Sequence, residues 1–173
     1  MPITVIQTSL PGVLLIEPQV FHDGRGFFSE SFNQRDFAAG TGQTVELVWE
    51  EVNEAPLGFV GGLFGAPDSS RCWLTRVTQG AILAVAVDLR PDSASRGLWV
   101  GVELSDENQR QLWVPEGCAF GLQVISDQAR FITKSTREGA PDEMPGLAWD
   151  DPEVKISWPV AVDPALVRGC RRD

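Results

Sequence analysis

The sequence predicts an all-β fold, an antiparallel jelly-roll barrel with short peripheral helices, from three observations. Ala81–Leu89 is an unbroken apolar run of strand length, and the turn-forming residues 90–92 end it. Such runs are typical of strands buried on both faces, which need cover from a second sheet. Leu98–Leu104 supplies a return strand, so that Gln79–Leu104 contains a hairpin. Many further short strand-like runs with turn residues between them, and little helix, favour a sandwich or a barrel.

The other elements follow from the same alternation of apolar runs and turn residues. Asn33–Ala39 is expected to form a short helix, with Asn33 as its N-cap and Gly40 at its end. Turns are expected at Phe21–Gly26 and Glu54–Pro56. Strands are predicted at Thr4–Gln7, Val13–Glu17, Gly26–Ser31, Thr44–Val52, Gly58–Phe64, Cys72–Thr78, Gln111–Val114, Cys118–Ile125, Arg130–Ser135 and Ile156–Pro159. Cys72–Thr78 is expected to pair with Ala81–Leu89 as a hairpin around Gly80.

Length and charge limit the organisation and the partners. A chain of 173 residues predicts a single domain over 1–173, with an N-terminal arm of about residues 1–20 and a C-terminal tail of about 160–173. The net charge of −10 disfavours nucleic acid and anionic membranes as partners. No apolar run is long enough to span a membrane, and the N-terminus does not resemble a signal peptide. A cytoplasmic protein is therefore expected.

Cysteine and histidine are too few for several kinds of catalytic site. The three cysteines have no metal-ligand spacing and are expected to be free thiols: Cys72, Cys118 and Cys170. His22 is the single histidine, so a multi-histidine metal site is excluded. A Ser/His/Asp triad would have to use His22, which lies within a turn sequence. The sequence predicts no bound metal and no cofactor.

Several segments resemble the dTDP-4-dehydrorhamnose 3,5-epimerases, a branch of the cupin jelly rolls. The resemblance runs from about residue 9 to 159 and rests on LPGVLLIE, RGFFSESFNQRDF, VAVDLR, WVGVEL, QLWVPEG and the Trp-Pro pair at 158–159. It implies a cupin-type barrel and a homodimer in which the N-terminal arm crosses to the partner. It also implies a reaction in which a base removes protons next to a ketone.

The resemblance also implies that polar residues of the family's site are replaced in this chain. The positions of the base, the lysine, a second histidine and a nucleotide-lining glutamine carry aromatic side chains: Phe64, Trp73, Phe120 and Trp49. The diphosphate arginine falls at Gly61, the tyrosine acid at Thr133 and a supporting aspartate at Cys170. Arg25 and Glu30 remain as polar substrate contacts, although a salt bridge within the turn explains Arg25 equally well.

These positions predict an aromatic-lined pocket, because residues that alternate along a strand keep their face. Glu51 is the one carboxylate expected near the pocket, unless its side chain points to solvent. Thr133, Gln123 or Glu51 would polarise a carbonyl group of the substrate. Phe64, Trp73, Phe120 and Trp49 would contact an apolar substrate, or would themselves fill the barrel as core.

Three functions remain open at the level of sequence. The favoured hypothesis is a cofactor-independent cyclase that shapes a hydrophobic, polyketide-like intermediate, since an aromatic cavity accelerates cyclisation by holding a near-attack conformer. The first alternative is a non-catalytic binding protein or pseudoenzyme. The second is an atypical dTDP-sugar epimerase or isomerase that uses other residues.

Overall fold

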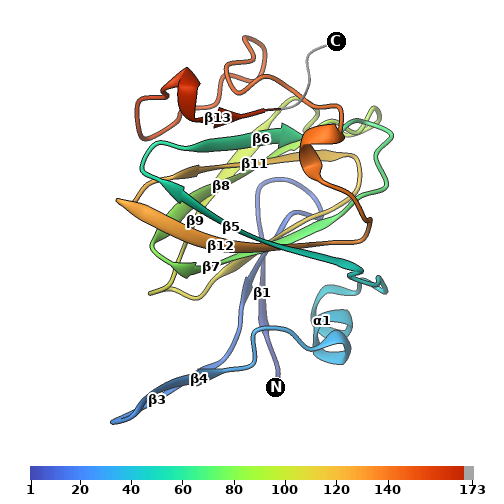
Figure 1. The fold of residues 1–173 in the computed structure, drawn as a ribbon. Coiled ribbons are helices and arrows are strands. Elements are labelled where there is room, and N and C mark those ends of the chain that lie inside the picture. Colours follow the sequence, from blue (N-terminus) through green and yellow to red (C-terminus); the bar gives the residue numbers. More distant parts are fainter. Residues whose placement is uncertain (170–173) are drawn as a thin grey trace.

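The fold is a sandwich of two β-sheets in a computed structural model that describes residues 1–169 (Figure 1). The first sheet has the strand order β1-β2-β10-β7-β12-β5 and the second β13-β6-β11-β8-β9. Neighbouring strands run antiparallel, apart from the parallel pair of β13 and β6. The first sheet is built from β1 (Thr4–Gln7), β2 (Leu14–Glu17), β5 (Trp49–Pro56), β7 (Trp73–Gln79), β10 (Gln111–Val114) and β12 (Gln128–Ser135). The second contains β6 (Val60–Phe64), β8 (Ala81–Asp88), β9 (Trp99–Ser105), β11 (Cys118–Val124) and β13 (Val167–Arg168).

The main core lies between the two sheets. Both sheets contribute buried side chains to it, among them Leu15, Trp73 and Leu112 from the first sheet and Ile82 and Phe120 from the second. Burial of this apolar surface stabilises the fold by roughly 25 cal/mol per Å² removed from water. The prediction of an antiparallel jelly roll is therefore confirmed.

The hairpin predicted within Gln79–Leu104 is confirmed, because β8 and β9 pair antiparallel from Ala81–Ser105 to Val87–Trp99. The hairpin predicted between Cys72–Thr78 and Ala81–Leu89 is wrong. β7 pairs with β10 and β12, whereas β8 belongs to the opposite sheet. Gly80 is where the chain crosses between sheets, with φ +77°, and a Cβ there would lie 2.2 Å from the Gln128 carbonyl oxygen.

Strand β5 also differs from the prediction. It begins at Trp49 and continues to Pro56, so the turn expected at Glu54–Pro56 is part of the strand. All eight of its residues face partners in β12, which accounts for this extension. Upstream, Val45 and Leu47 pack on a second apolar cluster on the outside of the first sheet. That packing buries them without strand pairing.

Helix α1 (Gln34–Thr41) covers this outer cluster. Its N-cap is Asn33, as predicted, whose side chain accepts from the backbone N–H groups of Arg35 and Asp36. The helix ends at Gly42, in the left-handed conformation, and not at Gly40. Phe37 packs edge-on against Trp113 with a ring-centroid distance of 5.1 Å.

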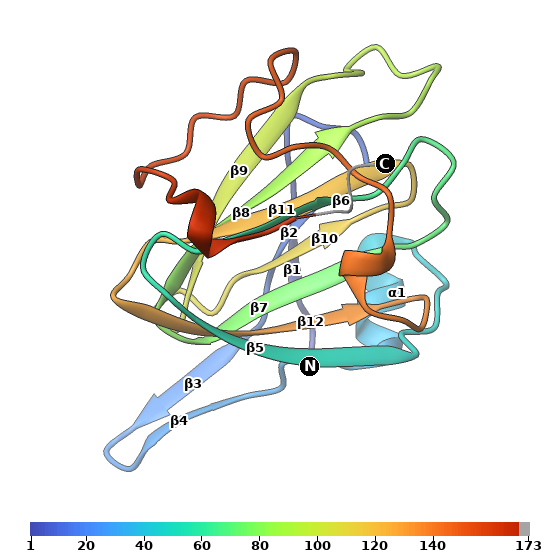
Figure 2. The same ribbon diagram turned by 45° about the horizontal axis from the view of Figure 1, so that its top comes forward.

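Strands β3 (Val20–Asp23) and β4 (Gly26–Ser29) form a hairpin that projects from the barrel (Figures 1 and 2). The turn predicted over Phe21–Gly26 is thus confined to the hairpin tip at residues 24–25. The C-terminal segment includes the short 3-10 helices η1 (Pro141–Glu143) and η2 (Pro164–Leu166). Ile156–Pro159 is not a strand, and β13 is the last strand of residues 1–169. No helix in that range is long and apolar enough to cross a membrane.

Candidate functional site

A pocket lies between the two sheets. Its volume is about 440 Å³, a figure that includes space open to solvent. The lining comes from both sheets and from η1, and consists of Glu51, Asn53, Phe59, Gly61, Phe64, Trp73, Phe120, Leu122, Phe131, Thr133, Pro141 and Arg168. Pockets with an apolar wall and a few polar groups are the usual form of a small-molecule site.

Strand register arranges the polar side chains of the pocket in a row across the first sheet. Thr75 pairs with Thr133, and Thr133 pairs with Glu51 on the next strand. The two threonine hydroxyls are 2.6 Å apart and buried. Glu51 is the one carboxylate among the lining residues in the described part of the chain, and Asn53 donates to it at 3.4 Å. The pocket therefore places a proton acceptor beside a hydroxyl pair.

The aromatic wall contains three of the residues predicted from sequence. Phe64, Trp73 and Phe120 line the pocket with exposed fractions of 7%, 1% and 4%. Trp73 packs on Phe120 across the two sheets, with ring centroids 5.8 Å apart and planes tilted by 33°. The Trp73 indole N–H is buried and donates to no acceptor in residues 1–169. These rings form much of the apolar part of the pocket wall.

Two polar residues of the pocket wall were not predicted from sequence. Arg168, on β13, lines the pocket and donates to the Asn53 side-chain oxygen at 3.4 Å. Asn53 in turn donates to Glu51. The alternation along β5 could have identified Asn53, which lies two residues from Glu51 on the same face. No local pattern identifies Arg168, because its contact spans 115 positions in the sequence.

Arg71 is a buried cation close to the site. Its guanidinium donates to the backbone carbonyls of Gly139, at 2.8 Å, and Glu138. These bonds fasten the loop before η1, which contributes Pro141 to the pocket. Burial lowers the pKa of Arg71, and the nearby Glu51 carboxylate acts in the opposite direction.

Two residues predicted for the site do not line it. Trp49 shares a row with Ser135 and Trp73 on the first sheet but is not part of the pocket wall. Gln123 is fully buried on β11, where its side-chain amide both donates to the Val160 carbonyl at 2.8 Å and accepts from the Val160 N–H at 3.0 Å. The catalytic role predicted for Gln123 is therefore corrected: its side chain ties the C-terminal segment to the second sheet.

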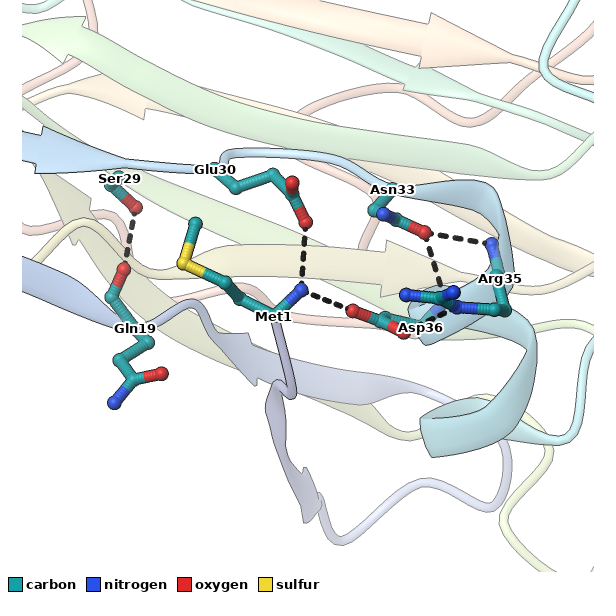
Figure 3. A network of polar contacts seen from close by, with 7 residues as sticks. All are labelled: Met1, Gln19, Ser29, Glu30, Asn33, Arg35 and Asp36. Carbon is teal, nitrogen blue, oxygen red and sulfur yellow. Dashed lines mark hydrogen bonds and ion pairs between the residues drawn. The ribbon is translucent and has the colours of Figure 1, made fainter.

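Arg25 lies in the turn of the β3–β4 hairpin and Glu30 directly after β4, and neither lines the pocket of its own chain. Arg25 pairs with Asp23 at 2.6 Å within the hairpin turn, the structural alternative considered for it. Glu30 accepts from the amino group of Met1, which also contacts Asp36 at the start of α1 (Figure 3).

The remaining reactive side chains lie outside the pocket wall. Burial raises the pKa of the Cys118 thiol to about 11 and also raises that of Cys72, which disfavours the nucleophilic thiolate. Both thiols are free, and Cys170 lies outside the described residues. His22 is on β3 of the projecting hairpin. Over residues 1–169, no three His, Cys, Asp or Glu side chains group as a metal site would require.

Comparisons with known proteins match nearly the whole chain to one family. Residues 7–169 match the family model described as dTDP-4-dehydrorhamnose 3,5-epimerase. The chain is 43% identical to the dTDP-4-dehydrorhamnose 3,5-epimerase of Shigella flexneri, over 90% of this chain and 87% of that protein. It is 44% identical to the enzyme of that name from Escherichia coli K12, over 90% of this chain and 84% of that protein.

Solved structures of sugar epimerases also superpose on nearly the whole chain. The epimerase RmlC of Legionella pneumophila, in complex with dTDP-4-keto-L-rhamnose, superposes with a TM-score of 0.87 at 34% identity, covering 95% of this chain and 89% of that chain. The Bacillus anthracis enzyme with TDP and PPi bound gives 0.86 at 35% identity, covering 95% and 96%. NovW of Streptomyces spheroides, a 4-keto-6-deoxy sugar epimerase from the novobiocin gene cluster, gives 0.85 at 27% identity, covering 96% and 87%.

These relatives overturn the cyclase hypothesis. That hypothesis assumed loss of sugar chemistry, whereas proteins at 43–44% identity over most of the chain are sugar epimerases. The assignment of Phe64, Trp73 and Phe120 to replaced catalytic positions stays a prediction, because the comparisons match the chain as a whole. The family model and the relatives together show that this chain belongs to the dTDP-4-dehydrorhamnose 3,5-epimerase family.

Proposed function

We propose that this protein acts on a dTDP-linked 4-dehydro sugar as an atypical epimerase or isomerase, with Glu51 as its base. Relatives of this family support the substrate class, and two of their structures carry dTDP-4-keto-L-rhamnose or TDP. The observation that carries the proposal is the position of Glu51, the one carboxylate on the pocket wall of the described chain, with Asn53 and Thr133 beside it.

The proposed reaction begins with removal of a proton next to a ketone, and a carboxylate can act as the base. A hydrogen on a carbon next to a ketone is acidic because the electron pair left behind is delocalised onto the carbonyl oxygen. The Glu51 carboxylate takes that proton, and a proton returned to the opposite face of the carbon inverts its configuration. A positioned base contributes about 10²–10⁴-fold to the rate of such a step. The chain contains no tyrosine, and its one histidine is on β3, outside the pocket wall, which leaves Glu51 as the candidate base.

Arg168 supports a nucleotide ligand at the same pocket. It is a cation on the pocket wall, bonded to Asn53 of the strand that carries Glu51, in a chain whose net charge is −10. A guanidinium matches the geometry of phosphate oxygens and binds them bidentately. We therefore place the diphosphate of the ligand at Arg168 and the sugar ring deeper, between Glu51 and the aromatic wall.

The test is solvent deuterium incorporation into dTDP-4-keto-L-rhamnose, followed by proton NMR at the two carbons next to the ketone. We expect exchange catalysed by the wild-type protein and a rate at least about 10²-fold lower for Glu51→Gln, which keeps the shape of the side chain. Glu54→Gln, on the opposite face of the same strand and exposed, is the matched control and should exchange at the wild-type rate. Equal rates for Glu51→Gln and wild type would refute the role of Glu51.

A second candidate is binding without conversion. Seven of the twelve lining residues have no polar side-chain atom, which favours retention of a ligand over proton transfer: Phe59, Gly61, Phe64, Phe120, Leu122, Phe131 and Pro141. Saturable binding of the keto sugar nucleotide, with no deuterium exchange above the buffer rate, would support this candidate against the epimerase.

We also propose a homodimer in which the arm contacts the second copy. The β3–β4 hairpin exposes Phe21, Phe27 and Phe28 at 47%, 58% and 64%, and three large apolar side chains on a projecting hairpin favour a protein partner. The family resemblance favours another copy of this chain as that partner. Sedimentation should give a dimer for the wild type and a shift to monomer for the double variant Phe27→Asp with Phe28→Asp.

A further inference from the structure

Asn53 connects the proposed base to a cation of the pocket wall. Its side-chain nitrogen lies 3.4 Å from a carboxylate oxygen of Glu51, and its side-chain oxygen lies 3.4 Å from a guanidinium nitrogen of Arg168. All three residues line the pocket. A chain of polar contacts therefore runs from β13, through the Asn53 amide on β5, to the Glu51 carboxylate.

The chemistry of these two neighbours decides which way the Asn53 amide faces. A guanidinium has hydrogen-bond donors only, and an ionised carboxylate has acceptors only. An amide has both, so it satisfies both neighbours only with its oxygen toward Arg168 and its NH₂ group toward Glu51. The reverse orientation would bring donor to donor at one end and acceptor to acceptor at the other. The orientation in the structure is the one that both neighbours require.

The opposite face of β5 holds a carboxylate in a different way. Glu54 accepts two hydrogen bonds directly from Arg130, at 2.9 and 2.6 Å, and one from Gln128 at 2.8 Å. A guanidinium in direct contact stabilises a carboxylate anion and so makes it a weaker proton acceptor. On the pocket face, an arginine reaches Glu51 through the Asn53 amide instead. An amide in this position holds the carboxylate and leaves it able to accept a proton.

We propose that Asn53 is the positioning residue of the Glu51 base: its amide, oriented by Arg168, fixes the carboxylate on the pocket wall. This inference rests on the proposed function and adds a second residue to it. Both contacts, at 3.4 Å, are long for hydrogen bonds, and such bonds in active sites often shorten only when the ligand binds. Because Arg168 is also the proposed diphosphate site, Asn53 connects binding of the nucleotide to the position of the base.

The first experiment compares Asn53→Leu with Gln128→Leu, since each change replaces an amide that donates to a carboxylate by an apolar side chain of similar size. We expect Asn53→Leu to lower the rate of deuterium exchange into dTDP-4-keto-L-rhamnose, at saturating ligand, by about 10- to 10²-fold, because a misplaced reacting group costs about that much. Its affinity for dTDP should stay within about threefold of wild type. Gln128→Leu, whose bond to Glu54 lies outside the pocket wall, should change neither quantity.

Two outcomes of this comparison would refute the inference. One is an Asn53→Leu protein that exchanges deuterium at the wild-type rate when saturated, or a loss of rate equally large in Gln128→Leu. The other is a loss confined to ligand affinity, with the rate at saturation unchanged. A residue that positions the base must alter the rate at saturation.

A second readout separates this inference from the proposed function. The side-chain NH₂ resonances of Asn53 are identified by NMR as the pair that disappears in Asn53→Leu. Glu51→Gln replaces the charged acceptor by an amide of the same shape, so this pair should move in Glu51→Gln and stay in Gln128→Leu. If the wild type exchanges no deuterium, the epimerase proposal fails, while a moved pair still supports Asn53 as the residue that holds Glu51. A pair that Glu51→Gln leaves unmoved overturns the inference, whatever the exchange rate.

Discussion

Asp88 and Trp73 both have a buried polar group, but the Asp88 carboxylate is fully hydrogen-bonded whereas the Trp73 indole N–H has no acceptor in residues 1–169. Asp88 ends β8 with its carboxylate fully buried, and it accepts from Arg90 twice at 2.9 Å and from Ser95 at 2.6 Å, with Ser93 as a further donor. Trp73 begins β7 and its indole N–H has no acceptor. Buried polar groups that serve the fold are paired within the fold. The contrast therefore separates a fully paired structural cluster from a buried donor that no acceptor in residues 1–169 satisfies.

The largest effect on stability is expected from Asp88→Asn. The change removes the negative charge opposite Arg90 and weakens the hydrogen bonds that close the β8–β9 turn. We expect the free energy of unfolding to fall by about 2–4 kcal/mol, measured by urea denaturation. Asp92→Asn, an exposed acid in the same turn, is the control and should cost less than about 0.5 kcal/mol. Equal stability of the two variants would contradict the structural role of Asp88.

Lowering the pH is a second test of the structural role of Asp88. Burial raises the pKa of Asp88, but the hydrogen bonds from Arg90, Ser93 and Ser95 outweigh it and hold that pKa well below its ordinary value. The unfolded value is about 3.9, so the stabilisation is present above that pH and is lost as the pH falls toward the native pKa. The stability difference between wild type and Asp88→Asn should therefore shrink below about pH 4, by up to roughly 1.4 kcal/mol per pH unit. A difference that stays constant down to pH 2.5 would assign the stabilisation to another group.

Local patterns in the sequence predicted the elements whose contacts are local. The β8–β9 hairpin and the Asn33 cap depend on residues close together in the chain. The crossing at Gly80 does not, since pairing partners 30 to 62 residues away decide to which sheet β7 and β8 belong. For the same reason no local signal placed Arg168 at the pocket.

The site was predictable where a strand has one buried face. Alternation along β5 and β12 directs Glu51 and Thr133 to the interior, and the structure places both on the pocket wall. Every residue of β11 is buried, so alternation there does not distinguish the pocket face from the far face. Phe120 and Gln123 lie on opposite faces, and Gln123 was assigned to the wrong one.

An intermediate effect is expected from Gln123→Leu. The new side chain has a similar size but leaves the Val160 N–H and carbonyl without their partner. We expect the free energy of unfolding to fall by about 1–3 kcal/mol, with ligand affinity unchanged, because the amide does not line the pocket. Gln128→Leu, on the exposed face of β12, is the control and should have little effect on stability. If Gln123→Leu is as stable as wild type but binds the ligand more weakly, Gln123 contributes to the site and not to the fold.

The smallest effects are expected for Trp73→Phe and Trp113→Phe measured without ligand. Neither indole N–H donates to an acceptor in residues 1–169, so neither change breaks a hydrogen bond there. The cost of each is the volume lost from a packed core, about 1 kcal/mol, and the two values should agree within about 0.5 kcal/mol. If Trp73→Phe costs 2 kcal/mol more than Trp113→Phe in urea denaturation, its N–H already stabilises the free protein. Trp73 would then resemble Asp88, and the contrast between a paired and an unpaired buried group would disappear. Equal costs would confirm that neither indole N–H contributes a hydrogen bond to the free protein, as the contrast with Asp88 requires.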